Sequence, residues 1–149
     1  MGAVVRILAG DVELSFDVDG AQLVPTDLGW AERPTVVLLE PTALYRDGLG
    51  PALARVAQVV YLDDRVDVDD LVGFLDALEI ERPVLVGASV AVVFASRHPG
   101  RAAKVVLVGR EEAGGIGCPV LVVSGADALR AATDDVVAFV LEPEREPEP

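Results

Sequence analysis

The sequence lacks several features on which common functions depend. It contains one histidine, one cysteine and no apolar run approaching the roughly 20 residues that cross a bilayer. A single cysteine excludes a disulfide within the chain and provides no cluster for a metal ion. The first ten residues, MGAVVRILAG, contain too brief an apolar stretch and too few basic residues for a signal peptide. We therefore expect a cytoplasmic protein without a membrane segment, a metal or another cofactor.

Basic residues are also scarce. The chain has 12 Lys and Arg against 25 Asp and Glu, which gives a net charge of −13 at pH 7. This charge opposes binding to nucleic acid or to an anionic membrane through a general electrostatic field. Residues 142–149, EPEREPEP, cannot build a core because glutamate alternates with proline. We expect one domain over residues 1–141 and a disordered acidic tail over 142–149.

Short apolar runs recur along the chain, such as VVLLE, VVYLD, VLVGAS, KVVLVG and VLVVSG. Short continuous valine and leucine runs are typical of parallel strands that are covered on both faces. Helical patterns alternate with these runs, and such alternation favours a sheet between two helical layers. The sequence therefore predicts a three-layer α/β/α sandwich with a mostly parallel sheet of about seven strands and an antiparallel hairpin at its N-terminal end.

The expected helices and strands follow from the spacing of apolar residues and from the residues that typically begin or end such elements. Polar residues alternate with apolar ones in the second strand, so Glu13, Ser15 and Asp17 are expected on a solvent-facing side. Residues 20–34 are expected to form a loop. Strands are expected at Val4–Ala9, Val12–Val18, Thr35–Leu39, Val59–Leu62, Val84–Gly87, Lys104–Val108 and Val120–Ser124, and helices over residues 49–58, after an Asp67 N-cap with Asp70 three positions later, from Val90 to Arg97, and after a Thr133 or Asp134 cap.

The segment over residues 84–99 carries the clearest chemical signal. A buried strand ends in Gly87-Ala88-Ser89-Val90-Ala91, and a helix begins at once. A serine on such a turn is lifted above the carboxyl edge of the sheet, and small residues two positions before and after it let the turn close. The backbone N–H of Val90, at the helix N-terminus, is placed to stabilise an oxyanion. Ser89 is the candidate nucleophile.

Four stretches resemble the α/β-hydrolases, especially the proline-iminopeptidase-like branch. They are ERPVLVGASVAVVFASRHPGRAAKVVLVG (81–109), DGAQLVPTDLGWAERPTVVLLEP (19–41), PALARVAQVVYLDDR (51–65) and CPVLVVSGADA (118–128). The resemblance covers roughly residues 12–141 in order and spacing. It implies a minimal α/β-hydrolase-like fold without a lid domain, with Asp127 in the place of the acidic member of the triad.

The chain departs from this family at the loops around the serine. Where the family has a His-Gly-Gly type loop that helps to form the oxyanion hole, this chain has Glu40-Pro41-Thr42. A carboxylate repels an oxyanion, and Pro41 has no N–H to donate. The lid between the later strands, commonly a helical insert, is reduced to residues 110–117.

The catalytic histidine of the family also has no counterpart after Asp127. The only histidine, His98, ends the helix that follows Ser89 and lies roughly 13 Å along its axis. A histidine at the C-terminal end of a helix interacts favourably with the helix dipole, and this one is too far from Ser89 to belong to a triad. Without a neighbouring base, a serine is a weak nucleophile. The sequence therefore predicts a truncated, degenerate relative of the hydrolases.

Three functions remain open. The first is a non-hydrolytic domain that binds a small apolar molecule or a protein partner. In this case the chain could also form a homo-oligomer through the face that is exposed by the loss of the lid. The second is an isomerase, cyclase, lyase or dehydratase that uses Glu40 or Asp127 as a base. The third is weak hydrolysis by Ser89, with a second chain as one source of histidine. Nucleotide binding is poorly supported, because one glycine follows the strand. The candidate pocket residues are Ser89, Val90, Glu40, Pro41, Asp63, Leu44, Tyr45 and Asp127.

Overall fold

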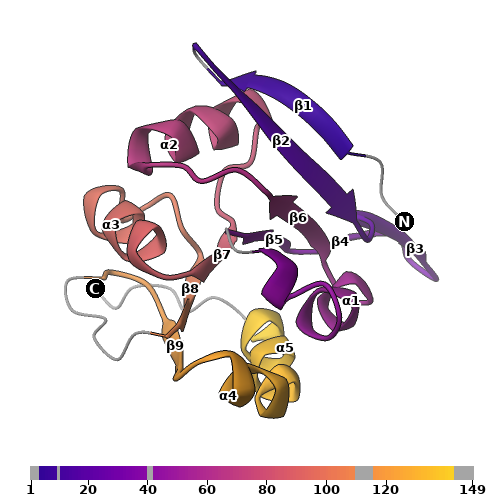
Figure 1. Ribbon diagram of the computed structural model, residues 1–149. Helices are drawn as coiled ribbons and strands as arrows, with labels where there is room; N and C mark the ends of the chain where they lie inside the picture. The colour runs from indigo at the N-terminus through magenta and orange to yellow at the C-terminus, as the bar shows by residue number, and fades with distance from the viewer. Residues whose placement is uncertain (1–3, 10, 40–41, 110–115, 143–149) are drawn as a thin grey trace, which may run out of the picture.

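A computed structural model of the chain describes residues 4–9, 11–39, 42–109 and 116–142. Its centre is a seven-stranded sheet with the order β1-β2-β6-β5-β7-β8-β9 (Figure 1). The first three strands pair antiparallel, and the pairs from β6 to β9 are all parallel. The strands are β1 (Val4–Ala9), β2 (Val12–Asp19), β5 (Thr35–Leu38), β6 (Gln58–Leu62), β7 (Val84–Gly87), β8 (Lys104–Val108) and β9 (Val120–Val123).

Helices cover both faces of this sheet (Figure 1). One layer holds α2 (Val68–Ala77) and α3 (Ser89–Arg97), and the other holds α1 (Leu49–Ala54), α4 (Ala126–Ala131) and α5 (Thr133–Leu141). A short 3₁₀ helix, η1 (Thr42–Leu44), precedes α1. This arrangement confirms the predicted fold class of a mostly parallel sheet with an N-terminal antiparallel hairpin between helical layers. Among the described residues, none of the helices combines the length and apolarity that crossing a membrane requires.

The pleat of the strands divides the core into two clusters. In β5, Val37 packs toward α2 and α3, whereas Val36 and Leu38 pack toward α1 and α5. Successive side chains of a strand point to opposite faces, and the short valine and leucine runs therefore supply both clusters at once. This double burial explains the high share of hydrophobic residues, 52 % of the chain.

Two sets of polar contacts stabilise helix ends, one at the start of α2 and one at the end of α5. Asp67 accepts a hydrogen bond from the Asp70 N–H at 2.8 Å while the Asp70 side chain accepts from the Asp67 N–H at 3.5 Å, so the predicted capping box of α2 is confirmed. Lys104, buried at the start of β8, donates to the carbonyls of Phe139 at 2.7 Å, Val140 at 3.2 Å and Glu142. The Phe139 carbonyl also accepts the Glu142 N–H of the cap at 3.3 Å. Carbonyls in the last turn of a helix have few N–H partners, and the ammonium is also favourable at the negative end of the helix dipole.

Several expected elements were wrong in detail. Residues 20–34 are not a plain loop, because β3 (Leu23–Thr26) and β4 (Gly29–Glu32) pair as a separate two-stranded hairpin. Four-residue strands with a proline in one of them carry little periodic signal. Residues 126–131 form α4, which was not expected. The α5 cap is also different: Ala132 is the N-cap, and the Thr133 hydroxyl donates to the carbonyls of Leu129 and Arg130 at 3.2 Å each.

The solvent-facing side expected for β2 was wrong at one position. Asp17 is buried, with 7 % of its surface exposed, although Glu13 is exposed and Ser15 half-buried. The reason is that β2 lies between β1 and β6, and the segment that contains η1 and Arg46 covers its second face near Asp17. Residues 110–115 of the lid remnant (110–117) and residues 143–149 of the tail (142–149) fall outside the described residues, and the roles predicted for both segments stay predictions.

Candidate functional site

The serine turn lies at the carboxyl edge of the sheet, where β7 passes into α3. Ala88 turns the chain with φ −122° and ψ −117°, and Ser89 is already the first residue of the helix. Glu79 is the only non-glycine residue with positive φ among those described, so Ser89 does not have the left-handed backbone conformation. The turn thus places the serine at the expected edge without local left-handed strain at the nucleophile position.

The small residues of the turn have a packing role. A Cβ atom added to Gly87 would lie 3.0 Å from both Cβ and Cδ1 of Leu39. Ala91 is fully buried in the cluster beneath α3. Close contact between the end of β7 and Leu39 accounts for Gly87, and burial in the core accounts for Ala91, whether or not Ser89 reacts.

A cleft of about 310 Å³ opens beside the serine. This volume is at the lower end of small-molecule sites, which span roughly 300–1,000 Å³. Its apolar part comes from Leu39, Val66, Ala88 and Val90, and its polar part from Ser89, Asp64 and Arg65. The Asp64 carboxylate accepts a hydrogen bond from the Ser15 N–H at 2.6 Å, which fixes its orientation. The cleft can enclose a small, largely apolar molecule and hold it by a few polar contacts.

The other predicted pocket residues are dispersed. Asp63 does not line the cleft and instead pairs with Arg46. Leu44 lines a different cleft, of about 610 Å³, with Leu49, Leu129 and Arg130 between α1 and α4. Tyr45 is buried in the core beneath α1, and this burial raises the pKa of its hydroxyl to about 12. Glu40 and Pro41 lie outside the described residues.

The predicted acidic partner is also distant from the cleft. Asp127 is exposed in the first turn of α4, after β9, and is not one of the residues that line the serine cleft. Strands β8 and β9 follow β7 in the sheet. Because neighbouring strands lie about 4.8 Å apart, the end of β9 is roughly 10 Å across the sheet from the end of β7. Among the described residues, no three His, Cys, Asp or Glu side chains group to hold a metal ion.

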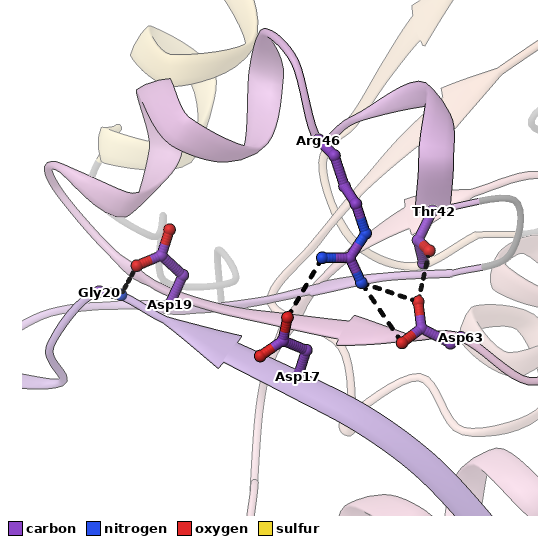
Figure 2. Close-up of polar contacts among 6 residues, drawn as sticks. All are labelled: Asp17, Asp19, Gly20, Thr42, Arg46 and Asp63. Carbon is purple, nitrogen blue, oxygen red and sulfur yellow. Dashed lines mark hydrogen bonds and ion pairs between the residues drawn. The ribbon is translucent and has the colours of Figure 1, made fainter. Parts of the chain in front are cut away.

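Asp63 belongs to an ion-pair cluster of Asp17, Arg46, Asp63 and Thr42 (Figure 2). The Arg46 guanidinium contacts Oδ2 of Asp17 at 3.1 Å and Oδ1 of Asp63 at 3.0 Å, and it lies 4.3 Å from the centre of the Tyr61 ring. The Thr42 hydroxyl donates to Asp63 at 2.6 Å. Burial lowers the pKa of Arg46, but the hydrogen bonds to Asp63 and Asp17 outweigh it and leave the pKa above its usual value. The cluster ties β2, β6 and η1 together.

The sequence interpretation thus missed which acid enters the cleft. Asp63 and Asp64 are consecutive, and the pleat sends consecutive side chains to opposite faces. Counting alternation from the buried strand would have separated them. The contribution of Val66 and of Ala88 had no comparable signal, because it depends on how the loop after β6 meets the turn after β7.

The histidine lies at the other end of α3 from the serine. His98 follows the last residue of the helix, its N–H donates to the Phe94 carbonyl at 2.8 Å, and the two ring centres are 5.3 Å apart. The separation from Ser89 along the axis is roughly 13 Å. A proton transfer from the serine hydroxyl requires a base within about 3 Å, or one water molecule further. The chain's single histidine cannot serve Ser89 in this fold.

The strand order and the serine turn define the α/β-hydrolase class of fold, and the comparisons with solved structures agree. The chain is similar to a meta-cleavage product hydrolase from Pseudomonas fluorescens IP01, with 26 % identity and a TM-score of 0.54 over 70 % of this chain and 44 % of that one. An enol-lactonase from Burkholderia xenovorans LB400 matches with 22 % identity and a TM-score of 0.57, over 70 % and 46 % of the two chains. An α/β-hydrolase fold protein from Chitinophaga pinensis matches with 18 % identity and a TM-score of 0.58, over 73 % and 44 %.

The chain therefore has the α/β-hydrolase fold. It spans less than half the length of these three solved structures. No protein-family model matches the chain, and no curated protein sequence matches it either. The resemblance to the proline-iminopeptidase-like branch stays a prediction.

Proposed function

We propose that this chain is a non-hydrolytic α/β-hydrolase-like domain that binds a small apolar molecule in the cleft beside Ser89. The observation that carries the proposal is the position of His98, which packs on Phe94 at the far end of α3. Removing the histidine of a serine triad in subtilisin costs about six orders of magnitude in turnover. Ser89 has no histidine within reach in this fold, and its hydroxyl can still donate and accept hydrogen bonds.

The lining of the cleft supports a ligand rather than a covalent reaction. Leu39, Val66 and Val90 supply apolar contacts, and Asp64, held by the Ser15 N–H, supplies a fixed acceptor. Open parallel sheets bind their ligands outside the carboxyl ends of the strands, which is where this cleft lies. The expected ligand is a compact apolar molecule with one hydroxyl or amide donor for Asp64.

Acid–base catalysis is a second candidate, and Asp64 favours it because it is a carboxylate in the cleft. Asp127, proposed as a base from the sequence, does not line the cleft. A protein partner or a second copy over the carboxyl edge is the third possibility that the sequence raised. Ligand binding alone leaves a bound compound unchanged, whereas acid–base catalysis converts it.

A ligand screen with a matched pair of variants tests the proposal. Small apolar alcohols and amides are expected to raise the melting temperature of the wild type and to be recovered chemically unchanged. Ala88→Phe places an aromatic ring in the cleft from an exposed position and should abolish the shift. Ala43→Phe, at the exposed lining of the other cleft, should leave it intact. Equal shifts in both variants would place the ligand elsewhere, and a converted compound would favour the acid–base enzyme.

A further inference from the structure

The β3–β4 hairpin exposes an apolar surface that the site beside Ser89 does not use. The hairpin forms its own two-stranded sheet and lies beyond the main sheet, at the right of the view in Figure 1. Three of its large apolar side chains are exposed: Leu28 fully, Trp30 to 72 % and Leu23 to 54 %. Clustered exposed apolar side chains on a protein surface commonly mark interaction sites.

The pairing register shows that the exposed apolar side chains of the two strands lie on one side of the hairpin. Val24 lies opposite Ala31, and both are half-buried. On the opposite side of the ribbon, Leu23 lies opposite Glu32 and Pro25 opposite Trp30, and all four are exposed. Residues that face each other across an antiparallel pair share one side of the ribbon. Leu23, Pro25, Trp30 and Glu32 therefore form one outward hairpin face, with Leu28 at the adjoining turn.

The turn is held in a defined shape. The Thr26 hydroxyl donates to the Gly29 carbonyl at 3.1 Å and accepts from the Leu28 N–H at 3.3 Å. Gly29 has φ +120°, a conformation that side chains rarely adopt. Leu28 thus lies on a turn whose conformation is fixed by hydrogen bonds. The outward hairpin face does not need to reorganise before it binds a partner.

The charge of the hairpin indicates what the partner carries. Residues 23–32 contain two carboxylates, Asp27 and Glu32, and no basic side chain. Neither carboxylate has an ion-pair partner among the described residues. Exposed tryptophan rings attract cations over their faces. A second copy of the chain, with a net charge of −13, and the chain's own tail, with four glutamates and one arginine, are both disfavoured here.

We propose that the outward hairpin face is a docking surface for a protein segment that carries both apolar and basic side chains. Leucine-type side chains of that segment would pack on Leu23, Leu28 and Pro25. A lysine or arginine would lie over the Trp30 ring and pair with Glu32. Aromatic residues surrounded by smaller apolar ones are typical of the centres of protein interfaces. This surface is separate from the Ser89 cleft and does not depend on its function.

The chain's only tryptophan makes the surface directly observable, because all tryptophan fluorescence comes from Trp30. The probes are a synthetic peptide of leucine and lysine and its twin with glutamate in place of lysine. The lysine peptide is expected to shift the Trp30 emission to the blue, and the glutamate peptide to have no effect. Leu28→Ser or Leu23→Ser should weaken the binding about tenfold, which corresponds to about 1.4 kcal/mol. Glu32→Gln should weaken it less.

Matched variants and two further arms decide the outcome. Leu8→Ser removes a leucine that is 65 % exposed at the far end of β1, and Glu13→Gln removes an exposed carboxylate there; neither should change the affinity. Equal binding of both peptides, or equal loss in Leu8→Ser and Leu28→Ser, would overturn the proposal. A blue shift with phosphatidylcholine vesicles and none with the lysine peptide would assign the surface to lipid instead. A shift on removal of residues 143–149 alone would assign it to the chain's own tail.

Discussion

At the scale of single residues, the charges in this chain separate into those that line the serine cleft and those that stabilise the fold. Asp64 belongs to the first kind, and Asp17, Arg46 and Asp63 to the second. Oδ1 of Asp17 is buried without a hydrogen-bond partner among the described residues, while its Oδ2 contacts Arg46. A buried carboxylate is costly unless it is paired. Arg46 is therefore needed chiefly because Asp17 is present.

A double-mutant cycle tests this dependence. Arg46→Met leaves Asp17 buried without its cation and is expected to reduce the free energy of unfolding by about 2 kcal/mol. Asp17→Leu combined with Arg46→Met should recover at least about 1 kcal/mol of that loss. Urea unfolding of the four proteins measures both values. Arg6→Met breaks an exposed pair at 3.8 Å and should change little. Additive effects of Arg46→Met and Asp17→Leu would contradict the account.

At the scale of elements, the end of α2 contains a residue that does not suit its backbone. Glu79 has φ 57° immediately after the helix. Its N–H donates to the Asp76 carbonyl at 3.2 Å, and the Ile80 N–H donates to the Leu75 carbonyl at 2.9 Å. This pair of bonds is the Schellman motif, in which glycine usually occupies the position of Glu79. The motif ends α2 and turns the chain toward β7.

Glycine at this position should stabilise the protein. Glu79→Gly is expected to raise the free energy of unfolding by about 0.5–1 kcal/mol, because relief of the left-handed conformation exceeds the added flexibility of the unfolded chain. Glu81→Gly provides the control, because Glu81 has no positive φ and should lose stability through the flexibility term alone. Thermal unfolding of both variants gives the comparison. A lower melting temperature for Glu79→Gly than for the wild type would refute this explanation.

At the scale of the whole molecule, the sheet has two edges with different surroundings. The carboxyl edge holds the serine cleft of about 310 Å³. A larger cavity, of about 880 Å³, lies at the amino ends of the strands, where Thr35, Gln58 and Lys104 begin β5, β6 and β8. Its size does not make it the chemical site, because Ser89 and the cleft acid Asp64 both lie at the other edge.

Much of this architecture could be predicted from the sequence, because the parallel strands have unbroken apolar runs. The serine turn was equally accessible, since Gly87, Ser89 and Ala91 follow one such run. The short β3–β4 hairpin and α4 could not be found in this way, because four to six residues hold too few periods to separate a strand or helix from a loop. The burial of Asp17 depends on Arg46, which is 29 positions away in the chain. Such pairing is a property of the tertiary structure alone.

Covalent labelling tests the proposal that Ser89 is not an activated nucleophile. The folded protein is treated with a serine-reactive fluorophosphonate, and its intact mass is measured beside Ser89→Ala and Ser96→Ala, the latter an exposed serine later in α3. We expect no labelling of the wild type or of either variant, because no histidine reaches Ser89. Labelling of the wild type and Ser96→Ala that disappears in Ser89→Ala would show that a base reaches the serine, and the protein would then have to be regarded as a hydrolase.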